Sequence, residues 1–107
     1  MRQRCALLIE YDGTKYAGWQ RQVNALTVQE VLEEAVKRIV GEGVTVIGSG
    51  RTDSGVHGFG QVAHVDVPIT CTIPDEKLAR AFNSALPFDV RIRAAKRVAD
   101  TFHARFD

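Results

Sequence analysis

Hydrophobic residues along the chain recur with two spacings, and the first is typical of β-strands. Apolar runs at residues 5–9 and 44–47 predict two short buried strands. Alternation of apolar and polar residues over 61–67 and 90–94 predicts two further strands, each with one buried face. In the last strand the buried face is expected to hold Val90, Ile92 and Ala94, and the other face Arg91 and Arg93. The chain can therefore supply a four-stranded sheet.

The second spacing repeats every three to four residues and predicts two helices. Residues 28–40 follow this rhythm, and the preceding Thr27 to Glu30 forms a capping box. Gly41 is placed to end this helix. A second helix is expected from Pro74 to about Leu86, with Pro87 at its end.

The expected order is strand, helix, strand, strand, helix, strand, which is the split βαβ arrangement of ferredoxin-like domains. This predicts one α+β domain over residues 1–107, with an antiparallel sheet and two helices on one of its faces. The opposite face is expected to be open and lined by Arg91, Arg93, His64 and the N-terminal arginines. Such a face can dock nucleic acid, a second domain or another subunit, and the sequence leaves these alternatives open.

The composition fits a single folded domain, because the 107 residues are 45% hydrophobic and 25% charged. The formal net charge of +1 neither requires nor excludes a polyanionic partner, since nucleic-acid binding depends on where positive charge is concentrated. Cys5 and Cys71 lack the spacing of a metal site or redox pair and are expected to be buried thiols. No apolar run approaches the roughly twenty residues of a membrane span, and no secretion signal is apparent, so a cytoplasmic location is expected.

Residues able to do chemistry are concentrated in the glycine-rich segment from Gly48 to Gly58. This segment surrounds one arginine, Arg51, and one carboxylate, Asp53, and contains too much glycine for a helix. Loops of this kind let a backbone and a ligand approach closely, and they carry many binding and catalytic groups. Asp53 is therefore the leading candidate for a catalytic residue. The alternative is local, with Asp53 closing a turn and Arg51 pairing with it.

Other interpretations of this segment fail on context. A phosphate-binding P-loop needs Gly-Lys-Ser or Gly-Lys-Thr before a helix, whereas Arg51-Thr52-Asp53 precedes a strand. Asp53-Ser54-Gly55 matches the tripeptide of dimeric aspartic proteases, but those proteins are almost wholly β. A catalytic triad of Asp53, Ser54 and His57 would require three near neighbours on one loop to form a chain of hydrogen bonds. The histidines lack the spacing of helical metal ligands, so a metal site is not expected.

The polar segment between residues 12 and 25 mixes cationic and aromatic side chains. Lys15 and Arg21 can reach phosphates, and Tyr16 and Trp19 can stack on bases. The two aromatic residues are equally suited to cover an edge of the core. The residue pattern alone leaves both roles open.

Several motifs together resemble the TruA family of tRNA pseudouridine synthases, and the resemblance runs the whole length of the chain. The glycine-rich segment carries its most specific motif, Gly50-Arg51-Thr52-Asp53-Ser54-Gly55-Val56-His57. The others are Tyr11-Asp12-Gly13-Thr14, Gly18-Trp19-Gln20-Arg21-Gln22, Gly60-Gln61-Val62, Asn83 through Leu86-Pro87, and Phe102-His103-Ala104-Arg105-Phe106.

The resemblance implies isomerisation of uridine to pseudouridine at positions 38 to 40 of the tRNA anticodon stem-loop, without a cofactor or metal. Asp53 would be the catalytic carboxylate, and attack at C1′, at C6 or on a sugar proton remain alternatives. Arg51 would pair with Asp53 and intrude where the target base leaves its stack. Lys15, Trp19, Arg21 and His57 would contact the RNA.

Members of this family are much longer than this chain, and bacterial ones carry a second, similar domain. The resemblance therefore implies an N-terminal domain without its C-terminal counterpart, inactive or nearly so alone, and a homodimer for the full-length protein. The family's active-site tyrosine, which stacks on the uracil, lies in that second domain. The alternative function is a stand-alone, non-catalytic RNA-binding module that keeps the loop for binding.

Overall fold

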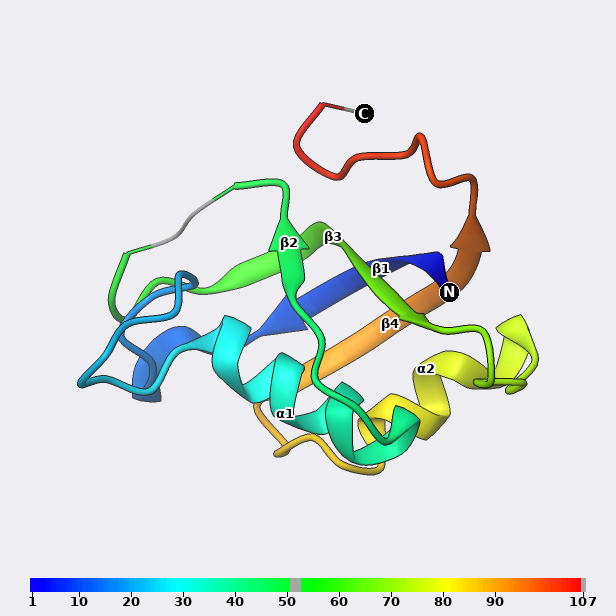
Figure 1. Cartoon of the computed structure of the whole chain (residues 1–107). Coiled ribbons are helices and arrows are strands. Elements are labelled where there is room, and N and C mark those ends of the chain that lie inside the picture. Colours follow the sequence, from blue (N-terminus) through cyan, green and yellow to red (C-terminus); the bar gives the residue numbers. More distant parts are fainter. Residues whose placement is uncertain (51–52, 107) are drawn as a thin grey trace.

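The two spacings produce the expected elements, and these segregate into a sheet layer and a helix layer (Figure 1). In the computed structural model, which describes residues 1–50 and 53–106, two helices cover one face of a four-stranded antiparallel sheet. The strand order β2-β3-β1-β4 confirms the predicted ferredoxin-like α+β fold. The elements are β1 (Arg2–Tyr11), the 3-10 helix η1 (Gly13–Lys15), α1 (Val28–Val40), β2 (Val46–Gly48), β3 (Gly58–Pro68), α2 (Asp75–Asn83) and β4 (Val90–Val98).

Helix α1 begins and ends where its capping residues predict. Thr27 Oγ1 accepts a hydrogen bond from the Glu30 N–H at 3.3 Å. At the other end Gly41 takes a left-handed conformation with a φ of 87°, which a residue with a Cβ adopts only at a cost.

Helix α2 ends earlier than expected, at Asn83 rather than near Leu86. The Asn83 side chain pairs twice with the backbone of Ile92, donating to its carbonyl at 2.9 Å and accepting from its N–H at 2.8 Å. The last helical residue is thus bonded to β4, and the chain turns there. Leu86 lies beyond the helix but still packs into the core, with 8% of its surface exposed.

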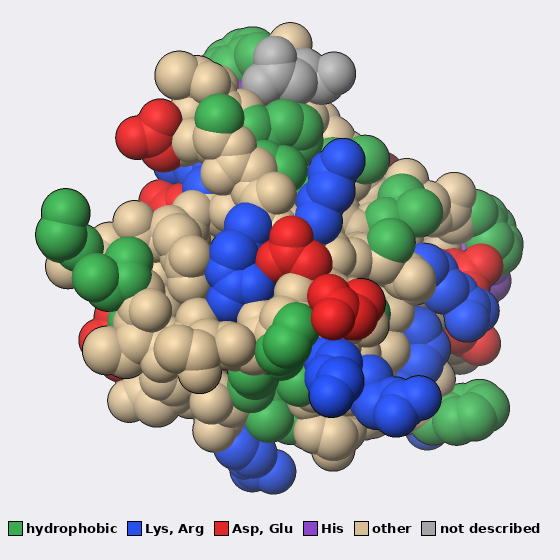
Figure 2. Space-filling view, turned by 90° about the vertical axis from the view of Figure 1, so that its right-hand side faces the viewer, with side chains coloured by type: hydrophobic (Ala, Val, Ile, Leu, Met, Phe, Trp, Pro, Cys, Tyr) green, Lys and Arg blue, Asp and Glu red, His purple; other side chains and the backbone are tan. Residues whose placement is uncertain are grey.

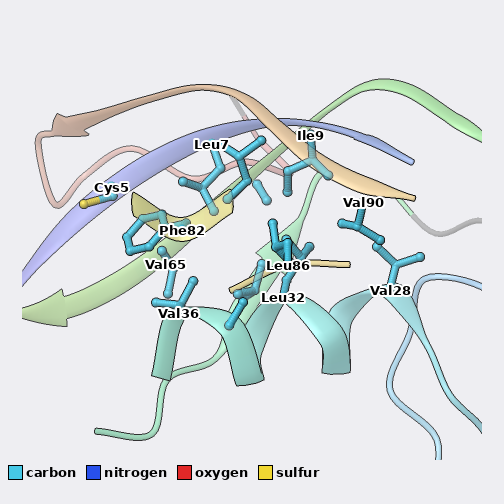
Figure 3. Close-up of a cluster of buried hydrophobic side chains, with 14 of the residues drawn as sticks. Cys5, Leu7, Ile9, Val28, Leu32, Val36, Val65, Phe82, Leu86 and Val90 are labelled. Carbon is cyan, nitrogen blue, oxygen red and sulfur yellow. The ribbon is translucent and has the colours of Figure 1, made fainter. Parts of the chain in front are cut away.

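The core fills the space between the sheet and the two helices, and Figure 3 shows its side chains pointing toward one another. β1 contributes Cys5, Leu7 and Ile9, while Leu32 comes from α1 and Phe82 from α2, each at most 1% exposed. Burial raises the pKa of the Cys5 thiol to about 11. Cys5 therefore stays protonated and packs as an apolar side chain.

A bulge changes which face of β4 is buried. Leu8 pairs with Ala94 but Ile9 pairs with Ile92, so one extra residue, Arg93, is inserted between them. An added residue reverses the alternation of faces along the rest of a strand. The prediction that Ala94 shares the buried face of Ile92 is therefore wrong: Ala94 is exposed.

Two arginines of β4 hold helix α2 on the sheet. Arg91, expected on the open face, instead donates to the carbonyls of Asn83, Leu86 and Pro87 at 3.3, 3.0 and 2.8 Å. Arg97 bonds the residues that lead into α2. Its acceptors there are Asp75 Oδ1 at 2.6 Å, the Ile73 carbonyl at 2.7 Å and the Cys71 carbonyl at 2.8 Å, and its Nε donates to Gln3 Oε1 of β1 at 3.0 Å.

We expect Arg97→Ala to lower the free energy of unfolding by about 2–4 kcal/mol, because it removes the charged pair with Asp75 and leaves the Ile73 carbonyl without its donor. Lys96→Ala is the matched control, since Lys96 is the exposed neighbour on the same strand. That control is expected to change stability by less than about 0.5 kcal/mol. Urea unfolding of both variants provides the measurement, and equal midpoints would contradict the role given to Arg97.

The C-terminal segment, residues 99–106, covers part of the face that was expected to be open (Figure 1). The Phe102 carbonyl accepts from Arg4 Nη1 at 2.6 Å, and the Ala104 N–H donates to His64 Nδ1 at 3.1 Å. The His64 and His103 rings meet edge-on with centroids 4.6 Å apart. His64 is only 4% exposed as a result, so this histidine is enclosed rather than lining an open face.

Burial, reinforced by the nearby charges of Arg4 and His103 and opposed by Asp66, lowers the pKa of His64 below its usual 6.5. Since the unfolded chain takes up this proton at a higher pH than the folded chain does, stability is lost as the pH falls below about 6.5. We expect a loss of up to about 1 kcal/mol per pH unit. His64→Asn can still accept from Ala104, because its Oδ1 lies near the position of Nδ1, but it does not titrate, so its stability should fall less between pH 7.5 and 5.5. Urea unfolding at the two pH values tests this, and equal losses would contradict it.

Candidate active site

The segment predicted to carry the chemistry is the connection between β2 and β3, and both of its arms are fixed to the body of the domain. We call residues 49–57 the catalytic loop, after the chemistry predicted for them. On the first arm the Ser49 N–H donates to the Val62 carbonyl at 2.8 Å, and Gln61 Nε2 donates to the Gly50 carbonyl at 2.6 Å. Arg51 and Thr52, at the middle of the loop, lie outside the described residues, so the pairing expected between Arg51 and Asp53 stays a prediction.

The second arm of the catalytic loop forms a tight turn that begins at Asp53. The Val56 N–H donates to the Asp53 carbonyl at 3.1 Å, and Gly55 has a φ of 78°, as expected for the third residue of a type II turn. The Gly55 N–H and Ser54 Oγ both donate to the Tyr16 carbonyl, at 3.0 and 3.3 Å. The backbone of Asp53 therefore does have the turn role considered as an alternative, and this leaves its side chain exposed at the surface.

The Asp53 carboxylate has no internal partner among the residues that the structure describes. Within residues 1–50 and 53–106, no side chain or N–H is bonded to it. A carboxylate held by a fixed backbone can act on a bound molecule as a base, a nucleophile or an electrostatic partner.

The Asp12-Gly13-Thr14 turn packs against the catalytic loop. The residue types in this turn do not by themselves predict that contact. A Cβ built on Gly13 would lie 1.8 Å from the Val56 carbonyl oxygen, so only glycine allows this approach. The Gly13 N–H also donates to His57 Nδ1 at 2.9 Å. The motif that contains these residues is visible in the sequence, but their contact with the loop depends on the fold.

The His57 ring lies between two possible partners. Its Nδ1 accepts from the Gly13 N–H when it carries no proton, and lies 3.2 Å from Asp12 Oδ1, to which it can donate when protonated. Hydrogen bonds from the side chain and backbone of Thr14 lower the pKa of Asp12. In either protonation state His57 is tied to the support of the catalytic loop, and its ring remains about half exposed.

Trp19 and Tyr16 take the packing role that was considered for them as an alternative. Trp19 is 2% exposed, and a Cβ on Gly48 would come within 2.7 Å of its ring. Tyr16 is 4% exposed and donates its hydroxyl to Asp89 at 2.5 Å. The Trp19 ring thus has no face open to a base, and it supports the start of the catalytic loop through Gly48.

The cations expected to contact RNA differ in their surroundings. Lys15 is exposed at the end of η1. Arg21 is bonded to Glu33 Oε1 through Nε at 2.9 Å and Nη2 at 2.8 Å, while about half of its side chain remains exposed. Glu33 is buried and its other oxygen accepts from the Val46 N–H at 2.9 Å, so Glu33 joins α1 to β2 and Arg21 ties the segment before α1 to that carboxylate.

A cavity of about 580 Å³ lies beside His57, at the end of the sheet. Its lining includes two strongly exposed aromatic residues, Phe59 at 83% and Phe88 at 93%. Arg93, which is paired with Glu10, also lines it. Exposed aromatic faces beside a guanidinium can hold an unpaired base.

Charge on the side of the molecule shown in Figure 2 is mixed, with basic and acidic side chains next to one another. Arginines of β1 and β4 have carboxylate partners: Arg2 with Glu42 at 3.0 Å, Arg4 with Asp66 at 2.8 Å and Arg97 with Asp75 at 2.6 Å. Cations already paired in this way are less available to a polyanion.

The described part of the chain was compared with the requirements of a metal site and of a membrane-spanning helix. Residues 1–50 and 53–106 contain no group of three or more His, Cys, Asp or Glu side chains placed to hold a metal ion. Within the same ranges, neither helix has the length and hydrophobicity needed to cross a membrane.

Comparison with known proteins agrees with the resemblance seen in the motifs. The family model described as tRNA pseudouridine synthase matches residues 7–107. A curated relative from Thermoanaerobacter sp. (strain X514), named tRNA pseudouridine synthase A, is 53% identical over 100 residues, covering 94% of this chain and 40% of the relative. Proteins of the same name from Thermosynechococcus vestitus and Nostoc sp. are 53% and 52% identical over 104 residues, covering 97% of this chain and 36% of each relative. The chain thus spans about 40% of the length of the curated relatives it matches, and it belongs to the TruA family of tRNA pseudouridine synthases.

Proposed function

We propose that this chain is the N-terminal, catalytic-loop domain of an enzyme that isomerises uridine to pseudouridine in the anticodon stem-loop of tRNA. The observation that carries the proposal is the exposed carboxylate of Asp53, which has no partner within residues 1–50 and 53–106 and lies on a loop whose two arms are both anchored. The reaction is inferred from membership of the tRNA pseudouridine synthase family, and the fixed loop is the proposed place where it occurs.

In the proposed reaction the bond between C1′ and N1 breaks, the uracil turns, and a bond between C1′ and C5 forms. The proton lost from C5 is balanced by one gained at N1, so the product is an isomer of the substrate. Asp53 acts where charge develops, either by attack at C1′ or C6 or by taking a sugar proton. A water-excluded pocket around the carboxylate would strengthen its effect on a developing cation.

The RNA contacts proposed for this chain surround the catalytic loop. Arg51 pairs with Asp53 and enters the space left by the extruded base, which offsets part of the cost of unstacking. Lys15 contacts a phosphate, and His57 faces the RNA beside the cavity with two exposed aromatic rings. Arg21 contributes its exposed half, whereas Trp19 acts by supporting the loop.

We propose that the rest of the cleft, including an active-site tyrosine, comes from a second domain, and that the complete protein is a cytoplasmic homodimer. The 107-residue chain alone is then expected to form little or no pseudouridine.

The test compares the 107-residue chain with a longer protein in which a second TruA-type domain follows it. Both are incubated with a tRNA that has uridines at positions 38 to 40, and pseudouridine is measured by mass spectrometry. Product formed by the longer protein would support the proposal. Bound tRNA without product in either protein, with both proteins folded, would overturn the enzymatic function and favour a non-catalytic RNA-binding module.

A further inference from the structure

The C-terminal segment ends its path across the sheet beside the start of the catalytic loop. Its contacts with Arg4 and His64 fix residues 102 and 104, on either side of His103. The next residue, Arg105, has its backbone N–H bonded to His103 Nδ1 at 3.1 Å. The position of Arg105 therefore follows from contacts made by its immediate neighbours.

Arg105 lines a cavity of about 170 Å³ together with residues of the loop and of the segment before α1. The other residues that line it are Trp19, Gln20, Gln29, Val46, Ile47, Gly48 and Gly50. Arg105 is thus the one charged side chain among the described residues of this lining. A Cβ built on Gly50 would meet no atom within 4 Å, so the loop backbone is open here.

Nothing in the described part of the chain neutralises this guanidinium. The Arg105 side chain has no carboxylate partner within residues 1–50 and 53–106. Glu33, the carboxylate bonded to Gln29 of the lining, is already bonded to Arg21 and the Val46 N–H as well. Arg105 differs in this from Arg21, whose charge Glu33 balances.

The chemistry of the cavity favours an anion over a base. The Trp19 ring in its wall is 2% exposed and offers no stacking face, whereas Gln20 is an exposed amide. The Gln29 amide is bonded internally, so the groups open to a ligand are the Arg105 guanidinium and the Gln20 amide, which match the oxygens of a phosphate.

We infer that the C-terminal segment places Arg105 at the start of the catalytic loop to bind a phosphate of the RNA strand that enters the site. This inference rests on the proposed function, since it takes tRNA as the ligand. The contacts of His64 and Arg4 with the segment then serve to position that cation.

The test measures the affinity of the 107-residue chain for an anticodon stem-loop RNA over a range of salt concentrations. Arg105→Ala is expected to weaken binding by about three- to tenfold at low salt and to reduce the slope of log K against log[salt] by roughly 0.7–0.9, the contribution of one phosphate contact. Arg105→Lys keeps the charge but loses the paired N–H donors of the guanidinium. Its affinity should therefore lie between those of the unchanged chain and Arg105→Ala.

Arg38→Ala is the matched control, because it removes the same charge from the last turn of α1, in the helix layer. Hydrogen exchange at the Ala104 amide checks that the segment stays in place in Arg105→Ala. Equal affinities of Arg105→Ala and Arg38→Ala would overturn the inference and leave the proposed function intact. Failure of the unchanged chain to bind the RNA even at low salt would overturn the inference and count against the proposed function.

Discussion

Asp53→Asn is expected to abolish pseudouridine formation, with a loss of at least about a thousandfold in kcat, when introduced into the longer protein that contains both domains. The amide keeps the size of the carboxylate but cannot act as a base or carry a negative charge. Because the side chain is exposed and unbonded within the described residues, the free energy of unfolding should change by less than about 0.5 kcal/mol. Single-turnover kinetics with saturating enzyme separates the chemical step from binding.

Ser54→Ala provides the comparison on the same turn. It removes only the hydroxyl that donates to the Tyr16 carbonyl at 3.3 Å, and the Gly55 N–H still donates to that carbonyl. We expect this variant to keep activity within about tenfold of the parent protein, since the turn retains its backbone hydrogen bond. A residual activity of Asp53→Asn close to that of Ser54→Ala would show that another group performs the chemistry.

The elements that the sequence predicted well are those set by local spacing and capping. Residues 28–40 form α1 as expected, because the apolar stripe, the Thr27 cap and Gly41 all specify the same helix. The bulge in β4 escaped prediction because it depends on how Leu8 and Ile9 pair with a strand far along the chain. No periodicity in residues 99–106 indicates that they fold back, since their position depends on contacts with Arg4 and His64.

In the candidate active site, the glycine-rich loop could be recognised from its composition. The residues that hold this loop in place could not be recognised in that way. Trp19 suits both an RNA surface and a core, and only the fold shows it against Gly48. The sequence predicts that Arg21 can reach a phosphate, but no local pattern indicates its bond with Glu33, twelve residues later on α1. The role of Gly13 arises from its contact with Val56, which no local pattern indicates.

Gly13→Ala is expected to lower kcat by at least about a hundredfold while the fold is retained. The added Cβ would lie 1.8 Å from the oxygen and 2.5 Å from the carbon of the Val56 carbonyl, so the backbone of the catalytic loop must move. Displacements of about 1 Å in a catalytic group can cost a hundredfold in rate. The steric conflict is expected to cost about 1–3 kcal/mol in stability, which leaves most of the protein folded.

Gly43→Ala is the matched control for that substitution. Neither Gly13 nor Gly43 has a positive φ, so alanine is allowed by the backbone at both positions. A Cβ on Gly43 meets no atom within 4 Å, and the residue lies between α1 and β2, away from the loop contacts. Activity, thermal unfolding and the amide NMR shifts of residues 53–57 are measured in both variants. Changes in those shifts and in kcat for Gly13→Ala alone would show that the close approach of Gly13 to Val56 positions Asp53, whereas unchanged activity would mean that the loop tolerates the displacement.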